Sequence, residues 1–219
     1  MSIFFAVGGL LIFALVLASL AHRYHAYVEE RRQHVQRILK RVDEIDRLVQ
    51  RMVGLPVPAE MERILRRDIL ARLQAAKGIH GRYPGIDGML STARQALDQA
   101  APRAASVEMN EQKIERFTRL MGELEWLLKE NRLLVEINEE EKEALLGTLV
   151  MRQTETLHHY HLGEAKRLLQ GNQLHQALWH CEQVKLMVKG AGFSNDELEG
   201  WYQEADRLHG EVTQLLSGV

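Results

Sequence analysis

A run of nineteen residues without a charged side chain, close to the N-terminus, constrains this chain more than any other feature. Residues 3–21 read IFFAVGGLLIFALVLASLA. A helix rises 1.5 Å per residue, so this run is about 28 Å long, close to the roughly 30 Å hydrocarbon core of a bilayer. We therefore expect residues 3–21 to form a transmembrane anchor whose partner is membrane lipid.

The flanking residues predict that this anchor is retained and which way it points. The small residues Ser19 and Ala21 are typical of a signal-peptidase site, so a cleaved signal peptide is the alternative. No Lys or Arg precedes the apolar run, whereas basic residues follow it at Arg23, Arg31, Arg32, Arg37, Lys40 and Arg41. The positive-inside rule then places the N-terminus outside and the C-terminal domain in the cytoplasm. We predict a single-pass protein of a bacterial inner membrane, with Tyr24 and Tyr27 at the lipid–water interface.

The charge of the remaining chain is divided unevenly. The net charge of the 219 residues is -2, but residues 22–82 hold 14 Lys and Arg against 8 Asp and Glu, and residues 104–148 hold 6 against 11. Basic residues beside a membrane favour anionic lipid headgroups. We expect no nucleic-acid partner, because acidic residues are mixed into the basic segment and aromatic residues are few.

Beyond the anchor, apolar residues recur three and four positions apart in the a and d positions of a heptad. They are Val28, Val35, Ile38, Val42, Ile45, Val49 and Met52, with Arg31 as the one break. Four heptads of this kind predict a helix that packs against another helix, either from a second copy in a homo-oligomer or from the chain's own later segments. Leu39 and Leu48 widen the stripe, which favours packing in a bundle.

Glycine and proline mark the ends of the next elements. Gly54 to Pro58 ends the first helix, and a second is predicted over residues 58–77. Its apolar face holds Met61, Ile64, Leu65, Ile69, Leu73 and Ala76. Residues 78–88 contain four glycines, and Tyr83-Pro84-Gly85-Ile86 has the pattern of a type II turn. Asp87 is then expected to cap a short helix that runs to Ala101.

From residue 103 onward the sequence has no proline, which predicts long helices. Asn110, Asn131 and Asn138 fall at d positions of a seven-residue rhythm, where we expect the seam to be exposed or frayed. Because no Gly or Pro lies near Asn138, we expect a kink or continuation there; the alternative is that Asn138 and Glu141 restart the helix as a capping box. Gly171-Asn172 predicts a left-handed helix end. A helix over 174–188 and a last helix after the capping box at 194–197 complete the chain.

No segment of the sequence alternates like a strand, so we predict an all-α fold. We expect an anchor at residues 1–21, a basic region at 22–103 and a distal helical domain at 104–219.

The hairpin over residues 161–187 resembles a single tetratricopeptide unit. Small and large residues stand at about that family's spacing at Ala165, Leu168, Leu174, Ala177 and Leu178. Asn172 replaces the usual glycine and Cys181 the usual aromatic residue. A single repeat cannot bury both of its faces, so the resemblance implies a helical hairpin that needs neighbours.

Two further groups of side chains are candidates for function. Trp179 and Leu186 lie on the side of their helix opposite Cys181, so they either bind a partner or are covered by the last helix with Trp201. His161, His180 and Cys181 are near one another across the hairpin and are weak metal candidates, because zinc needs a fourth ligand in tetrahedral geometry. We expect solvated or capping histidines, and no metal or other cofactor.

The sequence contains no catalytic motif. Residues 78–88 lack the ending of a phosphate loop, and neither a nucleophile elbow nor a His-Glu-x-x-His motif is present. We therefore predict a protein that is not an enzyme, a membrane-anchored scaffold or adaptor. The alternatives are a subunit of an envelope or secretion assembly with its helices in the periplasm, and a metal-binding helical enzyme.

Overall fold

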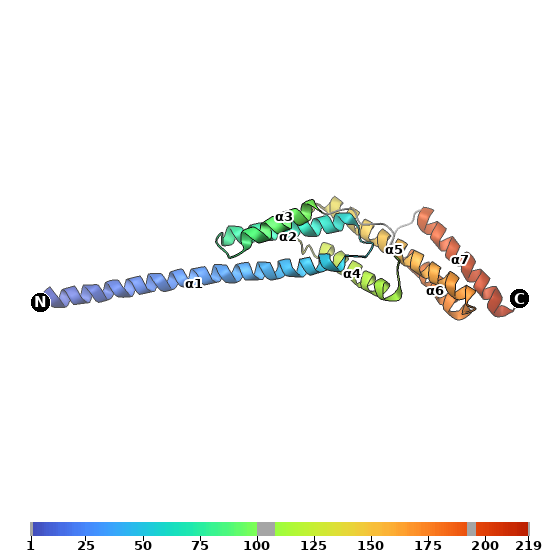
Figure 1. The fold of residues 1–219 in the computed structure, drawn as a ribbon, viewed down its shortest axis with the longest axis horizontal. Coiled ribbons are helices and arrows are strands. Elements are labelled where there is room, and N and C mark those ends of the chain that lie inside the picture. Colours follow the sequence, from blue (N-terminus) through green and yellow to red (C-terminus); the bar gives the residue numbers. More distant parts are fainter. Residues whose placement is uncertain (1, 100–107, 192–195, 219) are drawn as a thin grey trace. The chain divides into compact units, whose positions relative to one another are not determined.

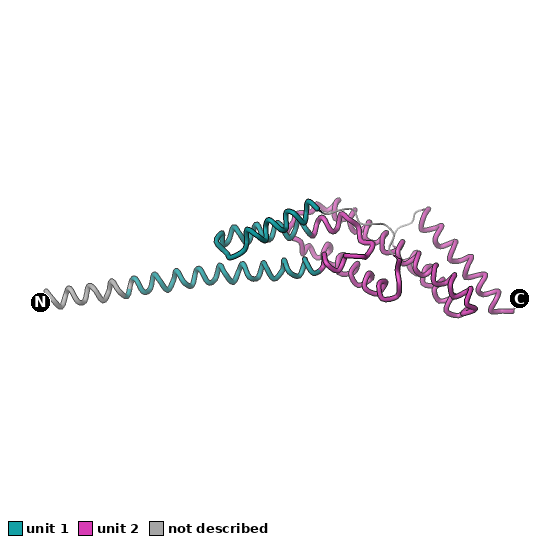
Figure 2. Tube along the Cα trace, viewed as in Figure 1, with its two compact units in different colours: residues 1–47, 66–99 teal, residues 48–65, 100–219 magenta. Residues whose placement is uncertain are grey.

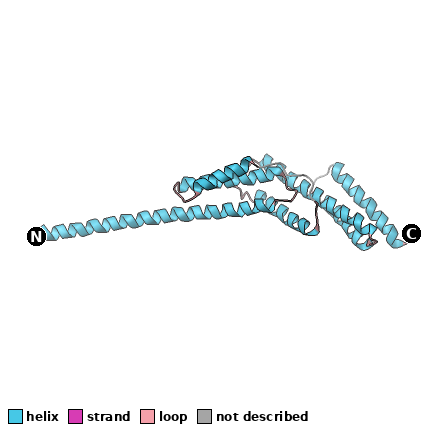
Figure 3. Ribbon diagram, viewed as in Figure 1, coloured by secondary structure: helices cyan, strands magenta, loops and turns pink. Residues whose placement is uncertain are grey.

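The computed structural model describes residues 2–99, 108–191 and 196–218, with the side chains of 2–14 and 16 left out. Within these residues the secondary structure is seven helices and no strand (Figure 3). They are α1 (Ser2–Arg51), α2 (Ala59–Ile79), α3 (Ile86–Asp98), α4 (Glu111–Lys129), α5 (Glu139–Gln170), α6 (Leu174–Gly190) and α7 (Asp196–Ser217) (Figure 1). The all-α prediction is confirmed.

The transmembrane assignment finds no support in this structure. Among the residues described, no helix is sufficiently long and apolar at once to cross a membrane. The segment 3–21 belongs to α1, which is helical from Ser2, but most of its side chains are outside the described set. The anchor therefore stays a prediction.

The chain forms two compact units, coloured separately in Figure 2. Unit 1 contains residues 1–47 and 66–99, and unit 2 contains residues 48–65 and 100–219. Unit 1 thus consists of most of α1, the greater part of α2, and α3. Unit 2 holds the end of α1, the start of α2 and the helices α4 to α7.

The turn between α2 and α3 in unit 1 confirms one prediction and corrects another. Gly85 has φ 81° and ψ -4°, and the amide of Ile86 donates to the carbonyl of Tyr83 at 3.3 Å, which is the predicted type II turn. The residue before α3 is therefore Gly85, so Asp87 does not occupy the N-cap position. Asp87 lies in the first turn, where its carboxylate pairs with Lys77 at 2.7 Å.

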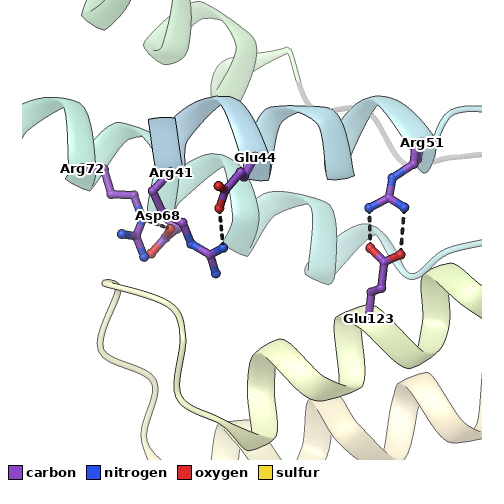
Figure 4. Close-up of polar contacts among 6 residues, drawn as sticks. All are labelled: Arg41, Glu44, Arg51, Asp68, Arg72 and Glu123. Atoms are coloured by element: carbon purple, nitrogen blue, oxygen red, sulfur yellow. Dashed lines mark hydrogen bonds and ion pairs between the residues drawn. The ribbon is translucent and has the colours of Figure 1, made fainter. Parts of the chain in front are cut away.

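The predicted apolar face of α2 is confirmed at every position. All six residues are buried: Met61, Ile64, Leu65, Ile69, Leu73 and Ala76. Their spacing of three and four residues places them on one side of a helix with 3.6 residues per turn. Asp68 is also fully buried, and the guanidinium of Arg72 donates to its carboxylate at 2.6 Å (Figure 4).

In unit 2, α4 ends at Lys129, and Asn131 closes this helix end. Asn131 has φ 49°, its amide donates to Leu128, and the amide of Arg132 donates to Leu127. This pair of bonds is a Schellman motif, in which asparagine accepts the left-handed conformation that most residues avoid. The kink or continuation predicted at Asn138 is therefore wrong, because the helix has already ended at Asn131 and α5 begins only at Glu139.

The other two asparagines of that rhythm begin helices. The side-chain oxygen of Asn110 accepts from the amide of Lys113 at 2.9 Å, and that of Asn138 accepts from the amide of Glu141 at 2.7 Å. Each bond satisfies one of the amides left without a partner in the first turn of a helix. The alternative that Asn138 restarts a helix is confirmed.

The left-handed helix end predicted at Gly171-Asn172 is confirmed, and the asparagine is the residue that adopts it. Asn172 has φ 56°, while Gly171 keeps φ -82°. The amide of Gln173 donates to the carbonyl of Leu168 at 2.9 Å, so α5 closes with a second Schellman motif.

Helices α5, α6 and α7 pack together in unit 2, with α6 in contact with both neighbours and α4 in contact with α5. One layer joins Leu162, Ala165, Cys181 and Leu208, and the next joins Leu168, Ala177 and Val212. Each layer takes residues from all three helices, so the hairpin of α5 and α6 has the neighbour that a single hairpin needs. Residues 194 and 195 of the predicted capping box lie outside the described residues.

An ion pair joins the end of α1 to α4 within unit 2. The guanidinium of Arg51 donates to both carboxylate oxygens of Glu123, with one nitrogen at 2.8 Å (Figure 4). The carboxylate raises the pKa of Arg51, chiefly through this hydrogen bond. Both side chains are close to half exposed, so the pair is worth only about 0.2–1 kcal/mol.

Candidate interaction surfaces

The seam predicted along α1 is covered at one end and open at the other. Val35, Ile45 and Val49 are buried within the single chain, as is Met52, while Val28, Ile38 and Val42 are half-buried. Burial within one chain is the outcome expected if this part of the seam docks internally. Association of two chains through Val28 to Val49 stays a prediction.

Upstream of the seam, residues 17–27, with Leu15, form the open stretch of α1. All of these side chains are exposed, including Leu17, Leu20, Tyr24 at 67% and Tyr27 at 54%. In Figure 2 the teal part of α1 runs on past the hairpin of α2 and α3. Leu17, Leu20, Tyr24 and Tyr27 are spaced three and four residues apart, so these large side chains lie along one side of the helix and leave an apolar and aromatic surface exposed.

Basic residues follow the open stretch directly. The guanidinium of Arg31 lies 5.1 Å from the ring centre of Tyr27, and Arg23, Arg32 and Arg37 are exposed. The aromatic rings thus come before most of the positive charges along the helix. This order of side chains is typical of a membrane–water interface, where aromatic rings lie between the lipid tails and the anionic headgroups.

The half-buried seam residue Val42 lies in a groove of unit 1 that we name the α1–α3 groove. Its volume is about 340 Å³. It is lined by Leu39, Val42, Asp43, Asp46, Arg66, Ile69, Leu73, Met89, Thr92, Ala93 and Ala96. The sequence analysis identified Val42, Leu39, Ile69 and Leu73 as apolar face positions, but it gave no sign that α3 would leave a gap beside them.

On α6, Trp179 and Leu186 remain uncovered, with exposed fractions of 51% and 63%. The expectation that Trp201 would cover them is wrong, because Trp201 stacks on His158 with ring centres 4.7 Å apart and planes at 13°. Trp179 instead contacts the rings of His161 and His180 edge-on, at 5.7 Å and 4.8 Å. A large aromatic side chain held by its neighbours and open to solvent is suited to anchor a protein partner.

The structure brings together two of the three metal candidates. The Nδ1 atoms of His161 and His180 lie 2.8 Å apart, so one ring donates its N–H and the other accepts. Burial lowers the pKa of His161 to about 4 and also lowers that of His180. Cys181 points away into the core, where burial raises the pKa of its thiol to about 11. Among the described residues, no three metal-binding side chains come together.

His158 is the residue whose setting the sequence analysis missed. Unlike the solvated or capping histidines expected from the sequence, it has an exposed fraction of 2%, and neither ring nitrogen has a hydrogen-bond partner. Its Nε2 lies 4.0 Å from a carboxylate oxygen of Glu204, which pairs with Lys166 at 2.9 Å. Burial, with the neighbouring His159, lowers the pKa of His158 to about 4. The available signal was its spacing of four residues from the core position Leu162.

No protein-family model matches the chain, and comparison with curated proteins and with solved structures finds no similar protein. The likeness of residues 161–187 to a tetratricopeptide unit therefore stays a resemblance.

Proposed function

We propose that this protein is a single-pass, membrane-anchored helical scaffold or adaptor that brings another protein to a membrane. The observation that carries the proposal is the continuity of α1, one helix from Ser2 to Arg51. Residues 3–21 and the buried positions of α1 belong to one unbroken helix. Attachment of residues 3–21 to a membrane would therefore keep the helices that pack on the other end of α1 at that membrane. Membrane lipid is the proposed partner of residues 3–21, with the N-terminus outside and the C-terminal domain in the cytoplasm of a bacterial cell.

The open stretch of α1 supports the membrane part of the proposal. Its exposed tyrosines lie between the apolar run and all of the nearby arginines except Arg23, which is close to the order that a bilayer interface favours. Burial of Val35, Ile45, Val49 and Met52 supports a folded body attached to this stretch.

Trp179 and Leu186 support the adaptor part. They are seven residues apart on α6, which places them two turns apart on the same side of the helix, and both are exposed. A protein partner would remove this apolar surface from water, worth about 25 cal/mol for each Å² covered.

Membrane integration is tested by alkaline carbonate extraction of membranes from cells that express the full chain. The wild-type protein is expected to stay in the pellet. Leu11→Arg combined with Val16→Arg should release it, because a charged side chain at the bilayer centre costs about 2.5–3.5 kcal/mol on insertion scales. Val53→Arg is the control, since Val53 is exposed and outside the anchor. Wild-type protein in the supernatant, or a mature chain that begins at His22, would rule out the anchor.

Orientation is tested by protease digestion of a C-terminally tagged chain in inside-out and right-side-out vesicles. The tag is expected to be digested in inside-out vesicles and protected in the others. The reverse pattern would favour the alternative of an envelope subunit with periplasmic helices.

The adaptor surface is tested by co-purification after mild detergent extraction. Trp179→Ala should weaken recovery of a specific partner while helicity by circular dichroism is unchanged. Trp126→Ala is the matched control, because Trp126 is similarly exposed but lies on α4. Loss of helicity in Trp179→Ala would assign Trp179 to the fold and not to binding.

A further inference from the structure

The α1–α3 groove has the dimensions of a helix-binding site. It takes residues from Leu39 to Asp46 of α1, from Arg66 to Leu73 of α2 and from Met89 to Ala96 of α3. Each of these spans covers eight residues, and the seven steps between its ends rise about 10 Å, or two helical turns. A groove that follows two turns of three helices matches an incoming helix with apolar residues at positions i, i+3 or i+4, and i+7.

Most of the residues that line the groove are apolar, and two of those on α3 are the small residues Ala93 and Ala96. Val42, Ile69 and Leu73 contribute branched side chains, while Ala93 lies on α3 and leaves room that a larger side chain would fill. Met89 is exposed at the edge, and its flexible thioether adapts to the shape of a bound side chain. The volume of about 340 Å³ is at the lower end of the range for ligand pockets, about 300–1,000 Å³.

The charge on the α1 side of the groove distinguishes it from the rest of this basic region. Asp43 and Asp46 are exposed, line the groove and are one turn apart. Within the described residues neither carboxylate is recorded in a hydrogen bond or ion pair, whereas the nearby Glu44 pairs with Arg41 at 2.8 Å. Arg66 of α2 also lines the groove, so its charged lining is two carboxylates and one guanidinium, a net charge of -1. This net negative charge beside apolar residues favours a ligand that is apolar on one face and positively charged at its edge.

We propose that the α1–α3 groove binds an amphipathic helix of a partner protein, with the apolar face of that helix on Val42, Ile69 and Ala93 and a Lys or Arg at its edge paired with Asp43 and Asp46. This inference rests on the proposed adaptor function and names a site and a partner class for it. The groove belongs to unit 1, whereas Trp179 and Leu186 belong to unit 2.

The test uses the full chain in nonionic detergent micelles and two synthetic 18-residue fluorescein-labelled peptides. Both carry leucine at i, i+3, i+7 and i+10, and the remaining charged positions are lysine in one peptide and glutamate in the other. Binding is measured by fluorescence anisotropy against empty micelles. The lysine peptide is expected to bind at least about tenfold more tightly than the glutamate peptide, because like charges across an interface repel.

Substitutions in the chain test whether the lysine peptide binds in the α1–α3 groove. Ala93→Phe fills the groove and should abolish saturable binding of the lysine peptide. Asp43→Asn with Asp46→Asn should weaken it about fivefold to tenfold, and less at 1 M salt, since screening shortens the range of the attraction to about 3 Å. Glu29→Gln with Glu30→Gln removes two exposed acidic charges from the same helix outside the groove and should change the affinity less than twofold.

Several results would overturn the proposal. These are the absence of saturable binding to the wild-type chain, equal binding of both peptides, or equal effects of the two double variants. Conversion of a dimer to a monomer by Ala93→Phe, seen by light scattering, would show that a second copy occupies the groove. If Ala93→Phe loses helicity, the aspartate variants decide the question alone. Because the peptide assay does not depend on insertion, carbonate extraction of the same chain tells failure of the anchor apart from failure of the groove.

Discussion

The open stretch of α1 and the bundle of α5 to α7 are both rich in apolar and aromatic residues, yet only the bundle covers them. Leu17, Leu20 and Tyr24 are exposed, while Cys181, Val184 and Ala205 are fully buried. The bundle has a third helix to close each layer of its core, and the open stretch has no neighbour within the described residues. Apolar content alone therefore does not separate a core from a surface that binds something else; the presence of a neighbouring element does.

The largest expected difference between the two regions is in stability. Leu208→Ala removes a buried side chain between α5 and α6 and should lower the free energy of unfolding by about 2–5 kcal/mol. Leu20→Ala, at an exposed position, should change it by less than about 0.5 kcal/mol. Urea denaturation followed by tryptophan fluorescence measures both. Similar losses in the two variants would show that the open stretch is covered in solution.

Acid should weaken the bundle through its buried histidines. The pKa values of His158 and His161 are both lowered to about 4, mainly by burial. A histidine with a lowered folded-state pKa contributes stability that is complete above its ordinary pKa of about 6.5 and is lost as the pH falls through about 4. For His158 the contribution is about 3 kcal/mol, since each pKa unit corresponds to about 1.4 kcal/mol.

His158→Phe isolates this contribution. Phenylalanine keeps a ring against Trp201 and removes two buried nitrogens without partners, so it should raise stability at pH 7 by about 1–3 kcal/mol. It should also flatten the decline in the free energy of unfolding between pH 6.5 and 4. A variant with the same pH profile as the wild type would show that His158 is already solvated in the native state.

A smaller effect is expected at the start of α5, the longest helix of the bundle. Asn138→Ala removes the side-chain oxygen that accepts from Glu141 and should cost about 0.5–2 kcal/mol. Asn138→Ser is the control, because serine is an equally good N-cap residue. Equal stability of the alanine and serine variants in thermal denaturation would argue against the cap.

The smallest effect concerns the ion pair between Arg51 and Glu123. A double-mutant cycle with Arg51→Gln and Glu123→Gln should give a coupling energy of about 0.2–1 kcal/mol, because both side chains are largely solvated. The coupling should fall at 1 M salt. A value above about 2 kcal/mol would mean that this contact is much less exposed to water than it is in the structure.

Local signals in the sequence were sufficient for the helices whose ends are marked by backbone chemistry. Gly85 and Asn172 adopt the left-handed conformation where the sequence predicts it, and the face of α2 from Met61 to Ala76 is buried as its spacing requires. These features depend on residues within a few positions of one another. Asn131 shows the limit, because its place in a seven-residue rhythm suggested a seam and its real role is to end α4.

The sequence by itself determined that this chain is helical, where most of its helices begin and end, and which side of each is apolar. Only the tertiary structure decided which apolar sides are covered. Val35 is buried while Tyr24 is exposed, and Trp201 stacks on His158 and leaves Trp179 exposed. His161 contacts His180, while the side chain of Cys181 is buried in the core. The physical reason is the distance along the chain over which each effect acts. Helix periodicity and capping act over three or four residues, whereas coverage depends on elements far apart in the chain that the spacing of side chains does not specify.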